Sequence, residues 1–145
     1  MVVIPATILA EMVAHVKQGY PDEACGLLGG KAGKVWLHQP TTNVEPENKK
    51  IRYLIEPREQ LHFEEELDRQ DLELVGIYHS HTHTPARPSP TDVRTAYYPD
   101  TFYILISLTD YEQPDVRAYR IVKPDPWGDT GEIVEQELQL VSEAV

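Results

Sequence analysis

Three of the six histidines lie within five residues of one another, at alternating positions: His79, His81 and His83. On an extended strand, successive side chains point to opposite faces, so His79 and His81 would share one face while Tyr78 and Ser80 share the other. Two imidazoles at this spacing can bind one metal ion. Zinc held by two histidines and a carboxylate, with a fourth position open to water, is a catalytic coordination set.

A carboxylate that could complete such a set follows the histidines. Asp92 ends the segment 89–92, Ser-Pro-Thr-Asp, which has the order typical of a helix start: an N-cap serine, a proline, and an acid in the first turn. A strand, a loop and this helix could fold Asp92 back over His79 and His81. Ser89 and Asp92 also have a purely structural interpretation, as a modified capping box. The local pattern therefore leaves two alternatives, a metal site or a polar loop before a capped helix.

The composition excludes several classes of protein. The chain has 145 residues, 41% apolar and 26% charged, which is ordinary for one globular domain, and we expect a single domain over residues 1–145. A net charge of −11 argues against nucleic acid and against anionic membrane surfaces as partners. Cys25 is the only cysteine, so no intramolecular disulfide can form. The first residues lack the basic and apolar segments of a signal peptide, so a cytoplasmic protein is expected.

Hydrophobic periodicity predicts the elements that must position these residues. Apolar residues at helical spacing indicate an amphipathic helix over 5–18, and a charged segment over 57–73 indicates an exposed helix. Short apolar or alternating runs predict strands over 25–30, 35–38, 52–55, 75–79, 102–108, 116–122 and 132–140, with the last at a sheet edge. Because helices alternate with strands, we expect an α/β fold with a mixed sheet covered by helices.

The order of the chemical residues resembles a known motif. His79, His81, Ser89 and Asp92 fit the pattern His-x-His, seven residues, Ser, two residues, Asp, which resembles the JAMM (MPN-plus) motif of zinc metallopeptidases. Glu23, just before a short apolar strand, stands where that motif has its upstream glutamate. The similarity extends over roughly residues 5–125 and is to the small prokaryotic branch of the family, which includes peptidases of sulfur-carrier proteins. The other segments that carry it are Asn43, Arg52-Tyr53, Glu56-Pro57, 85–92 and 103–108.

The resemblance implies a fold and a catalytic centre. The family fold is a curved mixed sheet flanked by helices, in a three-layer architecture similar to that of cytidine deaminases. One Zn²⁺ ion would be held by His79, His81 and Asp92. Glu23 would act as general base and then as general acid, and Ser89 would donate a hydrogen bond to the oxyanion of the tetrahedral intermediate.

One departure from the family pattern concerns the residue after the second histidine. Many relatives have proline there, whereas this chain has Thr82 followed by His83. A shifted ligand pair, His81 with His83, is therefore conceivable. We favour His79 with His81, because only they have the family spacing to Ser89 and Asp92, and we interpret His83 as a loop residue.

The resemblance also implies a class of substrate. Family members cleave after the C-terminal Gly-Gly of ubiquitin-like proteins, and small prokaryotic relatives act on ubiquitin-fold sulfur carriers, releasing an amino acid such as cysteine or a tail peptide. Arg87 or Arg94 is hypothesised to bind the carboxylate of a single-residue leaving group; the alternative is that both pair with surface acids. Asn43 is a third candidate substrate contact.

The sequence can also be compared with the requirements of four alternative functions. A general deconjugating isopeptidase for ubiquitin-like modifiers would have the same motif. A non-catalytic MPN scaffold is disfavoured because all five motif residues are present. A nucleobase deaminase needs a Cys-x-x-Cys pair, which one cysteine cannot supply. A cysteine hydrolase is disfavoured because nothing near Cys25 would lower the pKa of its thiol.

Overall fold

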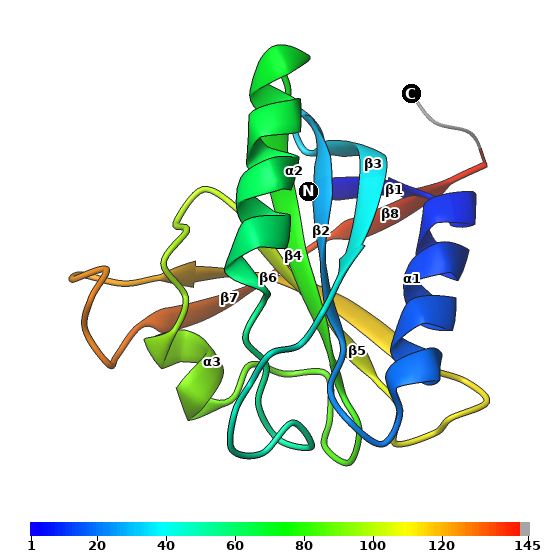
Figure 1. The fold of residues 1–145 in the computed structure, drawn as a ribbon, viewed down its shortest axis with the longest axis vertical. Coiled ribbons are helices and arrows are strands. Elements are labelled where there is room, and N and C mark those ends of the chain that lie inside the picture. The colour runs from blue at the N-terminus through cyan, green and yellow to red at the C-terminus, as the bar shows by residue number, and fades with distance from the viewer. Residues whose placement is uncertain (143–145) are drawn as a thin grey trace.

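The computed structural model describes residues 1–142, which form three helices and eight strands (Figure 1). In chain order they are β1 (Val2–Pro5), α1 (Ala6–Gly19), β2 (Cys25–Lys31), β3 (Lys34–Thr41), α2 (Pro57–Arg69), β4 (Glu73–His81), α3 (Pro90–Arg94), β5 (Phe102–Ser107), β6 (Asp115–Val122), β7 (Glu132–Gln136) and β8 (Leu138–Val141). Among these residues, no helix has both the length and the apolarity that crossing a membrane requires.

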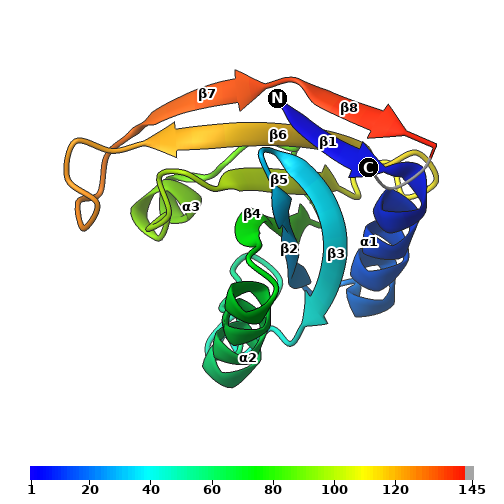
Figure 2. The same ribbon diagram turned by 90° about the horizontal axis from the view of Figure 1, so that it is seen from above.

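The strands form one mixed sheet in the order β7-β6-β5-β4-β2-β3-β1-β8. Strand β4 runs parallel to β5, and β1 runs parallel to both β3 and β8, whereas the other neighbours are antiparallel. Seen from above, the sheet is strongly curved (Figure 2). The expected α/β fold with a mixed sheet is therefore confirmed.

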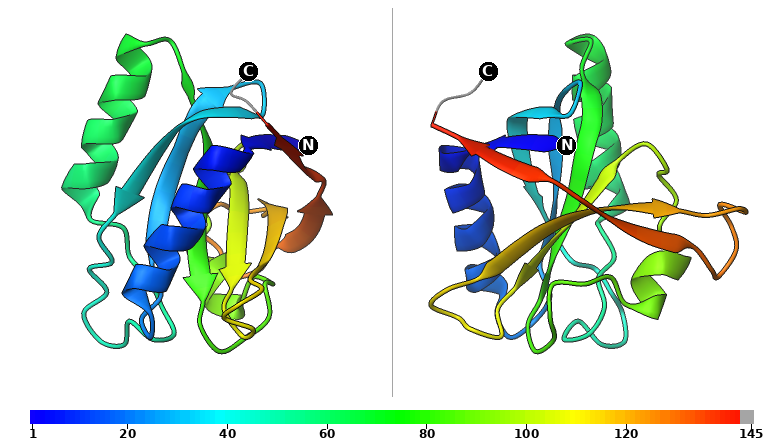
Figure 3. Two further views of the ribbon diagram at one scale, coloured as in Figure 1. Left: turned by 90° about the vertical axis from the view of Figure 1, so that its right-hand side faces the viewer. Right: turned by 180° about the vertical axis from the view of Figure 1, so that it is seen from behind.

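Helices cover both faces of the sheet, and a large hydrophobic core lies on each face (Figure 3). Helix α1 packs on one face through Ile8, Met12 and Val16, and α2 packs on the other through Phe63 and Leu67. The sheet residues divide the same way because side chains alternate along each strand. In β4, for example, neighbouring residues join different cores, Ile77 on the α2 side and Tyr78 on the α1 side.

The C-terminal segment forms the strands at both edges of the sheet. Strand β7 pairs with β6, and β8, which follows after Glu137, pairs with β1 at the opposite edge. The Val2 backbone N–H donates to the Glu137 carbonyl, 3.0 Å away. The segment 132–140 was predicted as one edge strand; it forms two strands, β7 and β8, and each of them is an edge strand of the curved sheet (Figure 3).

Most predicted elements agree with the structure, and the differences are local. Strand β1 was not predicted, although all four of its residues are buried. The expected strand 52–55 is a loop in which Ile55 forms a single bridge with Asn43. The helix predicted to reach residue 73 ends at Arg69, followed by a turn in which Asp71 has a positive φ of 54°.

Candidate metal centre

Strand β4 presents the two histidines from the middle of the sheet. It lies between β2 and β5, with Cys25 opposite His79 in one register and Ser107 beside His81 in the other. Both imidazoles are buried on the face of the sheet that carries α2, and Tyr78 lies on the opposite face. The alternation expected from the sequence is therefore the arrangement in the structure.

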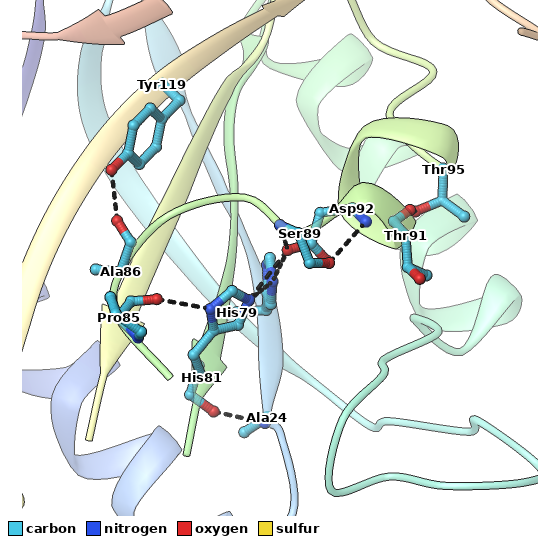
Figure 4. Close-up of polar contacts among 11 residues, drawn as sticks. Ala24, His79, His81, Pro85, Ala86, Ser89, Thr91, Asp92, Thr95 and Tyr119 are labelled. Carbon is cyan, nitrogen blue, oxygen red and sulfur yellow. Dashed lines mark hydrogen bonds and ion pairs between the residues drawn. The ribbon is translucent and has the colours of Figure 1, made fainter. Parts of the chain in front are cut away.

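Helix α3 carries Asp92 back to the histidines (Figure 4). Its N-terminus is a reciprocal capping box, in which the Asp92 N–H donates to Ser89 Oγ over 3.1 Å and the Ser89 N–H donates to Asp92 Oδ2 over 2.8 Å. The preceding loop is tied to the sheet, since Ser107 Oγ donates to the Thr84 carbonyl and the Tyr119 hydroxyl donates to the Ala86 carbonyl. These contacts fix the direction of the Asp92 carboxylate.

Three ligand atoms from these residues converge on one point. His79 Nε2 lies 3.2 Å from His81 Nε2 and 3.3 Å from Asp92 Oδ2, and His81 Nε2 lies 3.0 Å from Asp92 Oδ2. In a tetrahedral site with metal–ligand bonds of about 2.0–2.1 Å, ligand atoms lie roughly 3.3–3.4 Å apart. The three atoms therefore form a triangle close in size to one face of a tetrahedral site, and the arrangement is consistent with metal binding.

The hydrogen bonds of His81 give a second reason to place a cation there. Its Nδ1 faces the Pro85 carbonyl at 2.9 Å and must donate, since a carbonyl oxygen only accepts. A neutral His81 then points the lone pair of Nε2 at the Asp92 carboxylate, and two acceptors 3.0 Å apart need a proton or a metal ion between them. Nδ1 fixed by a carbonyl is also the usual support of a ligating histidine.

The pKa shifts of the three groups reflect this geometry. Burial lowers the pKa of His79, although the Asp92 charge opposes this, so the ring is held neutral. Burial also lowers the pKa of His81, but its hydrogen bonds to Asp92 and Pro85 outweigh it and the pKa is raised. Burial opposes ionisation of Asp92, yet the two histidines and the Ser89 N–H hold its pKa well below the usual range. The shifts of His79 and Asp92 thus favour the neutral imidazole and the ionised carboxylate that bind metals, whereas a metal ion at His81 would take the place of a proton on Nε2.

Glu23 lies beside this triangle because of the register between β2 and β4. Cys25 faces His79, and two hydrogen bonds of 2.9 Å continue the pairing: the Ser80 N–H donates to the Ala24 carbonyl, and the Ala24 N–H donates to the side-chain oxygen Ser80 Oγ. Two residues before Cys25, Glu23 therefore falls opposite His81.

The Glu23 carboxyl group is buried but has little hydrogen bonding. It is 5% exposed, and within residues 1–142 its Oε1 has no hydrogen-bond partner. Burial raises the pKa of Glu23 to about 8, with the His81 charge opposing and the Asp92 charge adding to the shift. A bound cation would draw this pKa down again. The group is therefore suited to exchanging a proton near neutral pH.

A cleft of about 460 Å³ opens beside these groups. It is lined by Glu23, Asn48, Lys50, Ile51, His81, Thr82, His83, Thr84 and Ser89. Ser89 Oγ accepts the Asp92 N–H, which leaves the hydroxyl proton free to donate to a group in the cleft. The candidate base, one ligand and the candidate oxyanion donor thus share one space open to a substrate.

The remaining candidate residues lie outside the triangle. Asn43 donates to the Glu23 and Arg52 carbonyls over 2.8 and 3.1 Å and accepts two backbone N–H groups, so its amide holds the loop that supports Glu23. Arg87 and Arg94 are exposed and do not line the cleft, and none of the ion pairs formed within residues 1–142 includes either of them.

The structure also shows the surroundings of His83 and Cys25, to which the sequence analysis gave no catalytic role. His83 is exposed at the rim of the cleft, and its Nδ1 lies 2.8 Å from Thr82 Oγ1. Cys25 is fully buried, and burial raises the pKa of its thiol to about 11, so a thiolate nucleophile is disfavoured.

Tyr53 contacts the centre and was given no role from the sequence. Its ring stacks on His79, with centroids 4.2 Å apart and an angle of 23° between the planes. The sequence showed Tyr53 only as part of the family resemblance. Its contact with His79 depends on the path of the 42–56 loop, which no local pattern reveals.

The chain is similar in sequence to several proteins named as peptidases or conjugate-cleaving proteases. The chain is 40% identical over 138 residues to the CysO-cysteine peptidase of Mycobacterium tuberculosis, covering 94% of this chain and 93% of the relative. It is 38% identical over 93 residues to a probable TtuB-protein conjugate cleaving protease of Thermus thermophilus, covering 64% and 62%. It is 31% identical over 102 residues to a desampylase of Haloferax volcanii, covering 66% and 73%.

Solved structures show the same fold. A solution structure of a protein from Desulfitobacterium hafniense superposes with a TM-score of 0.83 at 33% identity, covering 99% of this chain and 95% of the other. A JAB1/MPN domain protein from Archaeoglobus fulgidus superposes with a TM-score of 0.60 at 20% identity, covering 97% and 99%. The family model described as prokaryotic homologs of the JAB domain matches residues 5–122, and the chain belongs to that family.

Proposed function

We propose that this protein is a zinc-dependent peptidase that acts on a ubiquitin-fold sulfur-carrier protein. It would hydrolyse the amide bond after the carrier's C-terminal Gly-Gly and release an amino acid such as cysteine or a short tail peptide. The observation that carries the proposal is the triangle of His79, His81 and Asp92 ligand atoms next to the buried carboxyl of Glu23, whose Oε1 has no hydrogen-bond partner within residues 1–142. The name of the mycobacterial relative, CysO-cysteine peptidase, supports the choice of substrate.

The donor set suits zinc. Two imidazoles and one carboxylate leave a tetrahedral ion one open position, which is the composition of catalytic rather than structural zinc sites. When bound, zinc supplies a Lewis acid and lowers the pKa of coordinated water to about 7. His79, His81 and Asp92 would hold the ion, and Tyr53 would fix the plane of the His79 ring.

The chain's own residues supply the proton transfers and the charge stabilisation. Glu23 accepts a proton from the attacking water and delivers it to the departing amine, because amines leave only when protonated. The Ser89 hydroxyl, held in place by its capping bond to Asp92, donates to the oxygen that becomes negative in the transition state. One such donor typically contributes about 2.7–4 kcal/mol to transition-state stabilisation.

Intact-mass analysis of a cleavage reaction tests the proposal. The substrate is a ubiquitin-fold carrier ending in Gly-Gly-Cys, incubated with zinc-loaded wild-type protein, with chelated protein and with Glu23→Ala. We expect loss of the cysteine residue alone, only with zinc and only in the wild type. A protein that retains zinc yet leaves this substrate intact would refute the choice of substrate.

A deconjugating isopeptidase is the second candidate. The relatives from Thermus thermophilus and Haloferax volcanii are named as a probable conjugate cleaving protease and a desampylase, which favours isopeptide substrates. A parallel reaction with an isopeptide-linked conjugate of the carrier separates the two candidates. Faster cleavage of the conjugate than of the cysteine-extended carrier would make deconjugation the main activity. Zinc binding without either cleavage would indicate the scaffold alternative.

A further inference from the structure

The cleft beside the candidate metal centre contains a lysine that the proposed chemistry does not use. Lys50 lines the cleft together with Glu23, His81 and Ser89. The backbone around it is fixed from both sides. The carbonyl of the preceding residue accepts the Glu23 N–H over 2.7 Å, and the Lys50 carbonyl lies 3.4 Å from the Thr82 hydroxyl, which donates to it. Lys50 is thus held beside the reacting groups by its main chain.

The charge of Lys50 is available to a ligand. Of the 13 lysines and arginines in the chain, four form ion pairs within residues 1–142: Lys31, Arg52, Arg69 and Arg117. None of the ion pairs found within residues 1–142 includes Lys50, whose side chain is exposed. Lys50 lines the cleft and also a neighbouring groove that contains Asp22, Glu45 and Glu47, and within residues 1–142 it forms an ion pair with none of these acids.

The geometry of amide cleavage gives this cation a partner. When the leaving group is a single amino acid, its α-carboxylate carbon lies only about 2.5 Å from the scissile nitrogen, because one Cα separates them. That carboxylate must therefore enter the same cleft as Glu23 and Ser89. A leaving lysine side chain of a protein conjugate has only methylene groups at this position, so a cation there distinguishes the two kinds of substrate.

We propose that Lys50 binds the α-carboxylate of a single-residue leaving group and makes the site selective for carrier tails extended by one amino acid beyond Gly-Gly. This inference rests on the proposed function, since it assumes that a Gly-Gly tail enters the cleft. Arg87 and Arg94, which the sequence suggests for this role, do not line the cleft, whereas Lys50 does.

A binding measurement tests Lys50 without requiring turnover. The zinc-loaded Glu23→Ala protein is titrated with two fluorescent tail peptides ending in Gly-Gly-Ala, one a free acid and one a C-terminal amide. Alanine replaces cysteine so that no thiol competes for the metal. We expect the acid to bind about tenfold more tightly than the amide, in the lower range for a charge-assisted hydrogen bond because Lys50 is exposed.

Substitutions on the same background identify the cation responsible. Lys50→Met is expected to bring the acid-to-amide preference close to one, by weakening only the acid, and Lys50→Arg to keep most of it. Lys49→Met is the matched control, since Lys49 is adjacent and lies in a neighbouring surface groove outside the cleft. Melting curves of each variant show whether the fold is retained.

Each outcome decides the proposal. Equal binding of acid and amide by the Glu23→Ala protein, binding of neither, an unchanged preference in Lys50→Met, or an equal loss in Lys49→Met would overturn it. Loss of the preference in Arg87→Ala or Arg94→Ala instead would assign the role to that arginine. If the preference depends on Lys50 but the active enzyme cleaves no carrier, then the proposed function fails while the carboxylate site stands.

Discussion

The buried carboxyl of Glu23 is expected to make the metal-free protein less stable as the pH rises. Burial moves the pKa of this group in the folded protein from an ordinary value of 4.5 to about 8. Between these two pH values the folded protein holds a proton that the unfolded chain has lost. The free energy of unfolding must therefore fall as the pH increases through this window, and the contribution is fully lost only above pH 8.

The substitution Glu23→Gln isolates this effect, because glutamine keeps the size of the side chain and cannot ionise. One pH unit corresponds to about 1.36 kcal/mol, so the interval from 4.5 to about 8 sets a ceiling of roughly 4–5 kcal/mol. Water in the open cleft reduces the penalty, and we expect Glu23→Gln to gain about 2–4 kcal/mol at pH 8. At pH 5 the same substitution is expected to gain less than about 1 kcal/mol.

Thermal unfolding of the chelated protein, followed by circular dichroism at pH 5, 6.5 and 8, measures the difference. A gain of this size raises Tm by roughly 6–12 °C at pH 8 for a chain of about this length. Asp22→Asn is the control, since it removes the same charge one residue earlier. A Glu23→Gln protein no more stable than wild type at pH 8, or a gain that does not change with pH, would refute the reasoning.

Three further predictions concern the metal and the oxyanion. His81→Ala should lower bound zinc from about one ion per chain to almost none by elemental analysis, whereas His83→Ala should retain it; the reverse result would favour the shifted ligand pair. Tyr53→Leu should weaken zinc binding roughly tenfold in competition with a chelator, while Tyr53→Phe keeps the stacked ring and the wild-type affinity; equal affinities in both would contradict a positioning role. Ser89→Ala should lower kcat by about 10²–10³-fold with zinc retained, and should also cost about 1 kcal/mol of stability as a lost N-cap. A stability loss with unchanged kcat would leave Ser89 a capping residue only.

The parts of the site that could be predicted from the sequence are those encoded in short, local patterns. The alternation of His79 and His81 follows from the period of a strand, and the helix that carries Asp92 follows from the Ser-Pro-Thr-Asp start. In the structure the capping box and the ligand triangle use the same Asp92 oxygen, Oδ2. The structural and the metal-binding interpretations of this segment are therefore compatible, although they were posed as alternatives.

The parts that could not be predicted depend on long-range pairing. Strand β1 is four residues long and runs straight into α1, so nothing local separates it from the helix. The division of 132–140 into β7 and β8 reflects the curvature of the whole sheet, which brings β6 and β1 to opposite ends of one segment. The positions of Tyr53 and Lys50 depend likewise on the 42–56 loop, which is anchored by Asn43.

Contacts on the face of β4 opposite the histidines fix the position of this strand, and with it the positions of His79 and His81. Tyr78 directly precedes His79 in the sequence and points the other way, where its hydroxyl is 2.7 Å from both His15 Nδ1 and His38 Nε2. A hydroxyl donates one proton and accepts another, so these rings form a single ordered chain that joins α1, β3 and β4. Gly26, which pairs with Tyr78, has no Cβ to collide with its ring.

The second anchor on this face is Ser80, which accepts the Ala24 N–H and donates its own N–H to the Ala24 carbonyl. A shift of one residue in the register of β4 would exchange its faces, placing Tyr78 in the cleft and His79 against α1. Such a shift would break the contacts of Tyr78 and Ser80 together. The hydrogen bonds on the α1 side of the sheet therefore specify which residues of β4 lie on the α2 side, beside the cleft. The position of Glu23 opposite His81 follows from the same register.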